Sequence, residues 1–254
     1  MIKMVLIGTG NVANHLYKAF ETSKEASFIQ VFGRNKKALK SFSKKTATSD
    51  SLTKIKEADV YIIAISDDAI TSFTEKLPFK NRLVVHTSGT VAMNVLSDKN
   101  RKGVFYPLQT FTKNRVVDFS NIPLCIESEN ASDLKLLQRI GASISEKVEE
   151  INSEERKKVH VSAVIVNNFV NHLYFIGSDL LEKNNLSFDL LKPLIFETAL
   201  KMESHQPKDA QTGPAKRNDL KTIENHLNQL EESPYKDLYI QLTKSIIDTH
   251  GEKL

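Results

Sequence analysis

The first thirteen residues constrain the fold most, because a short apolar segment runs directly into a glycine turn. Residues 4–7 (Met-Val-Leu-Ile) predict a buried strand, and Gly8-Thr-Gly-Asn-Val-Ala13 opens a helix with a Gly-x-Gly-x-x-Ala pattern. In such a unit Gly8 permits the tight turn, Gly10 lets backbone amides approach a pyrophosphate, and Ala13 lets helix and strand pack closely. The helix N-terminus favours an anion. The pattern therefore predicts dinucleotide binding by Gly8, Thr9, Gly10, Asn11 and Val12.

A basic stretch after the second expected strand indicates which dinucleotide binds. Residues 27–32 predict that strand, and Gly33-Arg34-Asn35 follows it. A site that prefers NAD normally places Asp or Glu here for the ribose 2′-hydroxyl, whereas Arg accommodates the 2′-phosphate of NADP. No acidic residue occurs between Ser27 and Ser49. We therefore predict NADP, with Gly33, Arg34 and Asn35 beside the 2′-phosphate. The alternative, a solvated basic helix face, suits the later lysines better.

Composition and charge narrow the class of protein. The 254 residues are 40% apolar and 26% charged, which suits a soluble globular protein with an ample core. The net charge of +4 is mild and no basic run is interleaved with aromatic residues, which argues against a nucleic-acid partner. The single cysteine, Cys125, excludes an internal disulfide and fits a reducing compartment. Polar residues interrupt the longest apolar stretch, and the N-terminal apolar run is short for a signal peptide, so we expect a cytoplasmic protein without a membrane span.

Apolar runs and helices alternate through the first 150 residues. Further strands are expected over residues 58–65, 82–85, 103–111 and 122–126, a helix over 132–140, and a last strand near 144–148. This alternation suits the right-handed crossovers of a doubly wound parallel sheet. Ligands bind such sheets outside the carboxyl ends of the strands. We predict an α/β Rossmann domain over residues 1–150, with further cofactor contacts from Ser66, Asp67, Thr87 and Ser88.

Near Glu150 the pattern changes, and residues 151–254 predict an all-helical second domain. A long helix is expected over 157–181, apolar nearly all round and therefore central in its domain, and others over 190–202, from Asp219 and from Ser233-Pro234. Asn167, Asn168 and His172 interrupt the apolar surface of the long helix. Two interpretations stay open: hydrogen bonds to neighbouring helices, or contacts to substrate or nicotinamide.

A polar loop between two of these helices is a second candidate site. Residues 211–219 combine a Gly-Pro turn with several polar side chains, and Thr212, Arg217 and Asp219 would form a corner in which Arg217 binds a carboxylate or phosphate. The alternative is an exposed loop that ends in a helix cap. His226 lies about two turns beyond Asp219. No histidine has metal-ligand spacing, so we infer no metal.

Together these segments resemble a known family. The chain is similar to Rossmann-like NADP oxidoreductases that carry a C-terminal domain of unknown function and are often labelled F420-dependent NADP oxidoreductase-like. Their wider relatives are 6-phosphogluconate dehydrogenase-like, ketopantoate reductase-like and pyrroline-5-carboxylate reductase-like proteins. The resemblance spans nearly the whole chain, and its specific part is Gln-Thr-Gly-Pro taken with His-Thr-Ser-Gly. The matching segments are Gly8–Ala13, His86–Gly89, Tyr106–Phe111 with Gln109, Ala163–Asn171, and Gln211–Asp219 with His226.

The resemblance implies a nicotinamide held between the two domains and a homodimer formed through the helical one. Hydroxyacid dehydrogenase relatives carry a catalytic lysine on the long helix, three residues before a polar pair that ends in Asn. Here the pair is Asn167-Asn168, and Val164 occupies the lysine position. The serine-proline-alanine-type turn of pyrroline-5-carboxylate reductases is also missing, which argues against that activity.

A reductase without this lysine needs another proton donor. Our first choice is His86 and our second is His226 oriented by Asp219, with Asn168 as a further catalytic residue. We predict an NADP-dependent oxidoreductase of a small, anionic metabolite. The alternatives are an NADP-binding regulatory or scaffold protein without turnover, and a methyltransferase using S-adenosylmethionine, against which Arg34 argues. The expected substrate contacts are Gln109, Asn167, His172, Thr212, Arg217 and Asp219.

Overall fold

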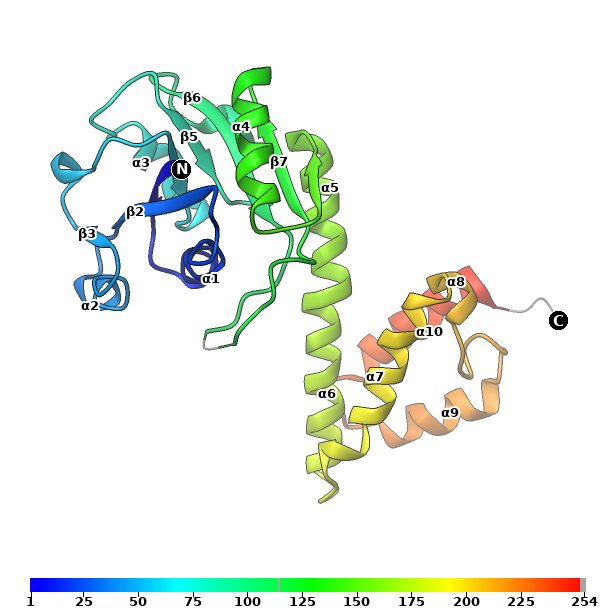
Figure 1. Ribbon diagram of the computed structural model, residues 1–254. Coiled ribbons are helices and arrows are strands. Elements are labelled where there is room, and N and C mark those ends of the chain that lie inside the picture. The colour runs from blue at the N-terminus through cyan, green and yellow to red at the C-terminus, as the bar shows by residue number, and fades with distance from the viewer. Residues whose placement is uncertain (114, 252–254) are drawn as a thin grey trace. The chain divides into compact units, whose positions relative to one another are not determined.

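The N-terminal half folds around one eight-stranded sheet in the computed structural model, which describes residues 1–113 and 115–251 (Figure 1). The strand order is β3-β2-β1-β4-β5-β6-β7-β8. The chain first adds β2 and β3 on one side of β1 and then adds β4 to β8 on the other side, as in a doubly wound Rossmann fold. The expected fold class is confirmed. The strands are β1 (Ile2–Ile7), β2 (Ala26–Phe32), β3 (Ala47–Ser49), β4 (Val60–Ile63), β5 (Leu83–His86), β6 (Arg101–Pro107), β7 (Leu124–Ser128) and β8 (Val148–Glu150).

Strand direction departs from the expected all-parallel sheet at its far edge. Strands β3, β2, β1, β4, β5 and β6 pair in parallel, but β7 pairs with β6 in antiparallel register and β8 then runs parallel to β7. The described residues between β6 and β7 form no helix, whereas a parallel pair usually needs a helical crossover between its strands. β3 was not predicted from the sequence, because a three-residue strand carries too little periodicity.

Two apolar cores lie on the two faces of this sheet, because alternate residues of each strand point to opposite faces. Met4 and Leu6 of β1 belong to one core, and Val5 and Ile7 to the other. The first core contains side chains of α1 and α4, and the second contains Ile70 of α3. The helices in this part of the chain are α1 (Asn11–Phe20), α2 (Lys36–Leu39), α3 (Ile70–Thr74), α4 (Ala131–Ala142) and α5 (Ser153–Ala163).

Between residues 151 and 251 all regular elements are helices, and the described residues form two compact units that divide after Asn168. The units divide inside the helical segment, eighteen residues beyond the last strand, so α5 belongs to the unit that holds the sheet. The expected cap at Asp219 is present, and Pro193 lies in the first turn of its helix. The later helices are α6 (Val170–Glu182), α7 (Lys192–Leu200), α8 (Pro207–Ala210), α9 (Leu220–Gln229) and α10 (Lys236–His250).

The expected long helix starts earlier than predicted and is interrupted by a wider turn. It extends from Ser153 to Glu182, begins at a capping box formed by Asn152 and Glu155, and is π-helical over Val164–Phe169. The prediction that this helix is central and buried was wrong for a single chain, because Val166 and Phe169 are more than half exposed. By length and composition alone the helix could also cross a membrane. Its apolar surface therefore needs a partner of some kind.

Candidate functional site

The glycine turn has the geometry that a bound pyrophosphate requires. Gly8 adopts a φ of +130°, and a Cβ there would lie within 2.7 Å of the carbonyl carbon of Ala64, so no other residue fits. Gly10 is the N-cap of α1, and a Cβ there would meet no atom of the described residues within 4 Å. The space beside the N-cap of α1 is therefore free of described residues. These residues fit a dinucleotide phosphate.

The end of β2 lies against this turn. A Cβ at Gly33 would come within 2.6 Å of the Thr9 side chain, so glycine is needed for the two loops to approach. Arg34 is exposed, as a phosphate ligand must be before binding. The Asn35 side-chain oxygen accepts a hydrogen bond from the Ala38 amide at 3.1 Å and caps α2. Of the expected 2′-phosphate ligands, Arg34 thus has a side chain that is free to turn toward a ligand.

Side chains at the ends of β4 and β5 bind to one another. The Ser88 and Thr90 hydroxyls donate to the Asp67 carboxylate at 2.8 and 2.7 Å, and the buried Thr87 hydroxyl donates to the Ile63 carbonyl at 3.3 Å. Ser66, by contrast, is exposed at the N-cap of a short 3-10 turn. Asp67, Thr87 and Ser88 therefore shape the loops beside the cofactor turn through contacts within the protein.

His86 does not have the surroundings of a general acid, which corrects our first choice of proton donor. The side chain is fully buried, and its Nδ1 accepts a hydrogen bond from the Ser88 amide at 3.2 Å. Burial and the nearby Arg156 guanidinium lower the pKa of His86 to about 4. The imidazole is therefore neutral at pH 7 and out of reach of a substrate, and its role is to order the His-Thr-Ser-Gly loop.

A buried ion pair fixes α5 against the sheet. Arg156 is fully buried, and its guanidinium donates to the Glu127 carboxylate of β7 at 2.5 Å and to the Val91 carbonyl at 2.6 Å. The Ser153 amide also donates to Glu127, at 3.1 Å. Residues four apart share a helix face. Anchoring Arg156 therefore also directs His160, one turn later, toward the end of the sheet.

His160 and Tyr106 meet at that end of the sheet. The Tyr106 hydroxyl, at the end of β6, lies 3.1 Å from His160 Nδ1, and their ring centroids are 6.1 Å apart. Both side chains are half-buried. A Cβ at Gly89 would lie 2.9 Å from the Tyr106 ring and closer still to His160, so the pair packs directly on that glycine. Burial raises the pKa of Tyr106 to about 12, so the hydroxyl keeps its proton at neutral pH.

These two residues line a pocket of about 880 Å³ that reaches back to the glycine turn. Asn11 and Val12 of α1 form one side. The side-chain Nδ2 of Asn11 donates to the Phe111 carbonyl at 3.0 Å, which ties the turn to the segment after β6. The expected residues Gln109, Asn167 and Asn168 line the same pocket. The π-helical segment brings the asparagines there, and such segments recur at functional sites.

Sequence reasoning missed five polar residues of this pocket: Tyr106, Thr110, Lys158, His160 and Ser162. Lys158 is exposed and makes no ion pair with any described residue. Tyr106 begins the segment Tyr106–Phe111, which matched the family, but only Gln109 in this segment was predicted to contact substrate. The Tyr106–His160 contact joins residues 54 positions apart, so no spacing in the sequence could reveal it.

The remaining expected site residues lie in the helical unit. The Asp219 carboxylate accepts hydrogen bonds from the Thr222 amide and hydroxyl, and His226 Nδ1 bonds the Tyr239 hydroxyl at 2.8 Å. Asp219 therefore does not orient His226, which corrects our second choice of proton donor. His172 stacks on Phe175, while Thr212 and Arg217 are exposed. Among the residues described, no cluster of three His, Cys, Asp or Glu side chains could hold a metal ion.

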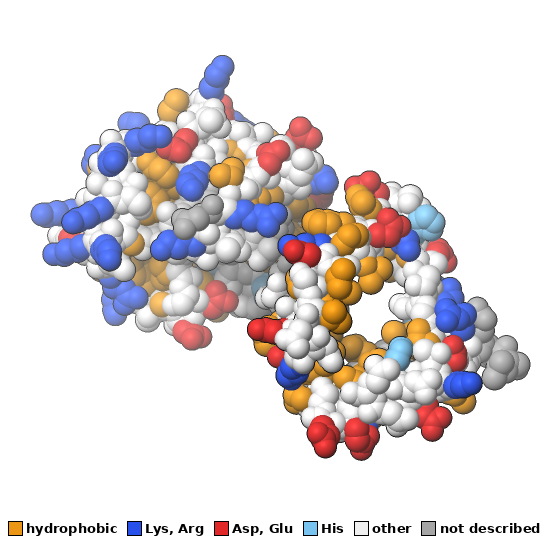
Figure 2. Space-filling view, turned by 90° about the horizontal axis from the view of Figure 1, so that it is seen from below, with side chains coloured by type: hydrophobic (Ala, Val, Ile, Leu, Met, Phe, Trp, Pro, Cys, Tyr) orange, Lys and Arg blue, Asp and Glu red, His pale blue; other side chains and the backbone are white. Residues whose placement is uncertain are grey.

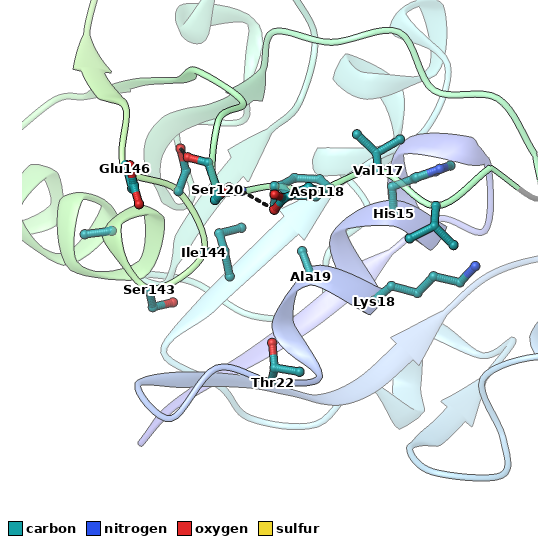
Figure 3. A pocket seen from close by; sticks show the side chains of 14 residues that line it. His15, Lys18, Ala19, Thr22, Val117, Asp118, Ser120, Ser143, Ile144 and Glu146 are labelled. Carbon is teal, nitrogen blue, oxygen red and sulfur yellow. Dashed lines mark hydrogen bonds between the residues drawn. The ribbon is translucent and has the colours of Figure 1, made fainter.

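A second hollow of about 460 Å³ lies beside α1 and the start of β8, and Figure 3 shows its lining. Several of its polar side chains already have partners within the chain, although Lys18, Thr22 and Glu146 form no side-chain bond with the described residues. His15 bonds the Asn11 carbonyl at 2.8 Å and the Arg115 carbonyl at 2.9 Å, and Asp118 accepts from the Ser120 amide at 3.0 Å. The Ser143 hydroxyl donates to the Ile140 carbonyl at 2.7 Å. These bonds hold the segment 115–120 in place, so the pocket beside Tyr106 is the better candidate site.

Comparison with known proteins identifies the family. Residues 3–89 match the family described as coenzyme F420-dependent NADP oxidoreductase, and residues 122–246 match a domain of unknown function, DUF2520. The chain is 38% identical to a Bacteroides fragilis protein assigned as an NADP oxidoreductase, with 97% of this chain and 98% of that chain covered and a TM-score of 0.89. The chain belongs to this NADP oxidoreductase family. The expected resemblance is confirmed.

More distant structures share the fold of this NADP oxidoreductase. A Thermotoga maritima protein is 19% identical, with a TM-score of 0.76 and coverage of 97% of this chain and 98% of that one. A reductive aminase from Aspergillus terreus, solved with NADPH and ethyl levulinate, is 13% identical, with a TM-score of 0.71 and coverage of 100% and 96%. No protein of curated function matches the chain. At these identities the two likenesses show the fold alone.

Proposed function

We propose that this chain binds NADPH across its glycine turn and transfers a hydride to a small, anionic carbonyl or imine compound held in the pocket beside Tyr106. One observation carries the proposal: Asn11 and Val12 belong both to the first turn of α1 and to the lining of the pocket. A dinucleotide on the α1 N-terminus therefore has its reactive end within reach of that pocket. When bound, NADPH supplies the hydride.

The pocket lining supports an anionic substrate. Lys158 contributes a cationic side chain, and Gln109, Asn167 and Asn168 contribute amides that donate hydrogen bonds. Val12, Phe111 and Val164 supply apolar walls. Val164 occupies the position where related dehydrogenases carry lysine. In this chain the amino group comes instead from Lys158, which lies on an earlier turn of the helix. A carboxylate beside the reacting carbon matches this combination.

We expect Arg34→Ala to weaken NADPH binding by about 10- to 100-fold and to leave NADH binding within about twofold, since a charged hydrogen bond contributes about 1.5–3 kcal/mol. The measurement is a fluorescence or calorimetric titration of each cofactor. Lys44→Ala is the matched control, because Lys44 is exposed in the same basic stretch and should leave both affinities unchanged. Equal affinities of the native protein for NADPH and NADH would contradict the cofactor assignment.

Turnover is tested with NADPH and a panel of keto acids, imines and flavin-like acceptors, followed by loss of nicotinamide absorbance. Oxidation that depends on one acceptor class supports the reductase. Tight NADPH binding without oxidation by any acceptor class would instead favour a regulatory or scaffold role. The single buried cysteine and the likeness to an NADP oxidoreductase support a cytoplasmic site of action.

We further propose that two copies of the chain associate through the helical unit. Among residues 169–251, Ile176, Ala215 and Ile223 are the buried apolar side chains, too few to stabilise a unit of this size. Figure 2 shows hydrophobic side chains of this unit gathered around an open hollow. A second copy of the chain is a better partner for this apolar surface than a lipid bilayer is. Burying the polar side chains of Asn171, His172 and Asp179 in a bilayer would be costly. The exposed apolar side chains include Phe175, Leu190, Leu194, Phe196 and Leu200.

We expect the native protein to sediment with about twice the mass of one chain, and Phe196→Glu to shift it toward a single chain because a charge would be buried at the interface. Analytical ultracentrifugation measures both masses. Gln229→Glu introduces the same charge at an exposed polar position and should leave the mass unchanged. A native protein that sediments as a single chain at micromolar concentration would contradict the proposal.

A further inference from the structure

The pair formed by Tyr106 and His160 is built into the pocket more firmly than its other polar residues. Tyr106 ends a central strand, and His160 lies one turn beyond the buried Arg156 anchor. Both rings pack directly against Gly89, so neither ring can move further toward that loop. By contrast, Gln109, Asn167 and Asn168 are exposed and bond mainly to their chain neighbours. Such fixed geometry suits a group that must meet a reacting atom.

We propose that Tyr106 is the catalytic acid of the reduction and that His160 returns its proton, an inference that rests on the proposed function. As the carbonyl carbon accepts the hydride, the electron pair of the breaking C=O π bond moves onto oxygen, which takes the proton of the Tyr106 hydroxyl. His160 then passes the proton on its Nδ1 to the phenolate oxygen while its Nε2 takes a proton from water, and the hydroxide left behind is neutralised by the buffer. Exchange of the ring protons with solvent restores the Nδ1–H form before the next turnover. For an imine, nitrogen takes the place of oxygen.

The arrangement of donors decides whether this relay operates. Because the Tyr106 proton must face the substrate, His160 has to donate from Nδ1 to the Tyr106 oxygen rather than accept from it. The high pKa of Tyr106 keeps its proton in place until negative charge develops on the substrate. The half-buried position of His160 gives it access to water for the return of the proton.

The first test uses the full-length protein without cofactor, so it does not depend on any substrate. Nitrogen-15 chemical shifts of the His160 ring, assigned by comparison with His160→Asn, report which ring nitrogen carries the proton at pH 8. We expect the Nδ1–H form in the native protein and a shift toward the Nε2–H form in Tyr106→Phe, which removes the partner oxygen. An Nε2–H form in the native protein would overturn the relay.

The second test follows turnover with an acceptor found in the panel. We expect Tyr106→Phe to lower kcat/KM by about 10²- to 10⁴-fold, the usual contribution of a general acid, with an unchanged Kd for NADPH. Tyr17→Phe is the matched control, because its hydroxyl bonds Thr46 at 2.7 Å away from the pocket. Native-like turnover in Tyr106→Phe overturns this assignment alone, whereas absence of NADPH binding by the native protein overturns the proposed function.

Discussion

We expect Gly8→Ala to lower the free energy of unfolding by about 3–5 kcal/mol and to abolish NADPH binding. The substitution places a Cβ against the Ala64 carbonyl at the start of the segment after β4, in a backbone conformation that alanine rarely adopts. The two central strands β1 and β4 would have to separate to make room. Urea denaturation measures the loss of stability, and calorimetric titration measures the loss of binding.

Gly10→Ala provides the matched comparison for this prediction. A Cβ at Gly10 points into space that is free of the described residues, so we expect the free energy of unfolding to fall by at most about 1 kcal/mol, the cost of a weaker N-cap. Binding of NADPH should nevertheless fall strongly, because the added methyl group occupies the path of the pyrophosphate. Equal stabilities of the two variants would show that the close approach at Gly8 is not what requires glycine.

The second large effect is a loss of stability at acidic pH caused by His86. Its pKa is about 4 in the folded protein and about 6.5 in the unfolded chain, so the unfolded chain binds more protons between these values. Stability is therefore full above about pH 6.5 and falls as the pH drops toward 4. The shift corresponds to about 3 kcal/mol, because protonation would place a charge in a buried site and beside the Arg156 guanidinium.

The measurement is urea denaturation at several pH values between 4 and 8. His86→Asn retains an acceptor for the Ser88 amide but does not titrate, so its stability should depend less steeply on pH in this range. His205→Asn, at an exposed position, serves as the control and should retain the native pH dependence. If the native protein and His86→Asn lose stability in parallel, burial of His86 is not the cause.

Local sequence patterns were sufficient to predict the strand, glycine turn and helix at the N-terminus. The apolar run 4–7 and the spacing of Gly8, Gly10 and Ala13 indicate a strand, a turn and a helix that are all within thirteen residues. Asp219 likewise caps the helix that follows it. These features depend on backbone conformation and on neighbours close in sequence, which a pattern records directly.

The chemical half of the site could not be predicted in the same way. His86 has a suitable side chain at a suitable strand end, but burial keeps it neutral. The pair of Tyr106 and His160 exists because Arg156 anchors α5 to β7 and because Gly89 leaves space for both rings. The antiparallel direction of β7 is equally invisible in an apolar run, since alternation and hydrophobicity are the same in either direction.

By itself the sequence determined the Rossmann fold, the glycine turn and the basic residue that favours NADP, because each follows from short-range conformation and charge. The tertiary structure alone decided that His86 is buried and that His160 lines the pocket, since burial and hydrogen-bond partners depend on segments brought together from distant parts of the chain. It also showed that a helix that is apolar nearly all round leaves much of its apolar surface exposed in the single chain. Apolar periodicity predicts that a helix face is buried, and only the folded chain shows which apolar side chains of that face remain exposed.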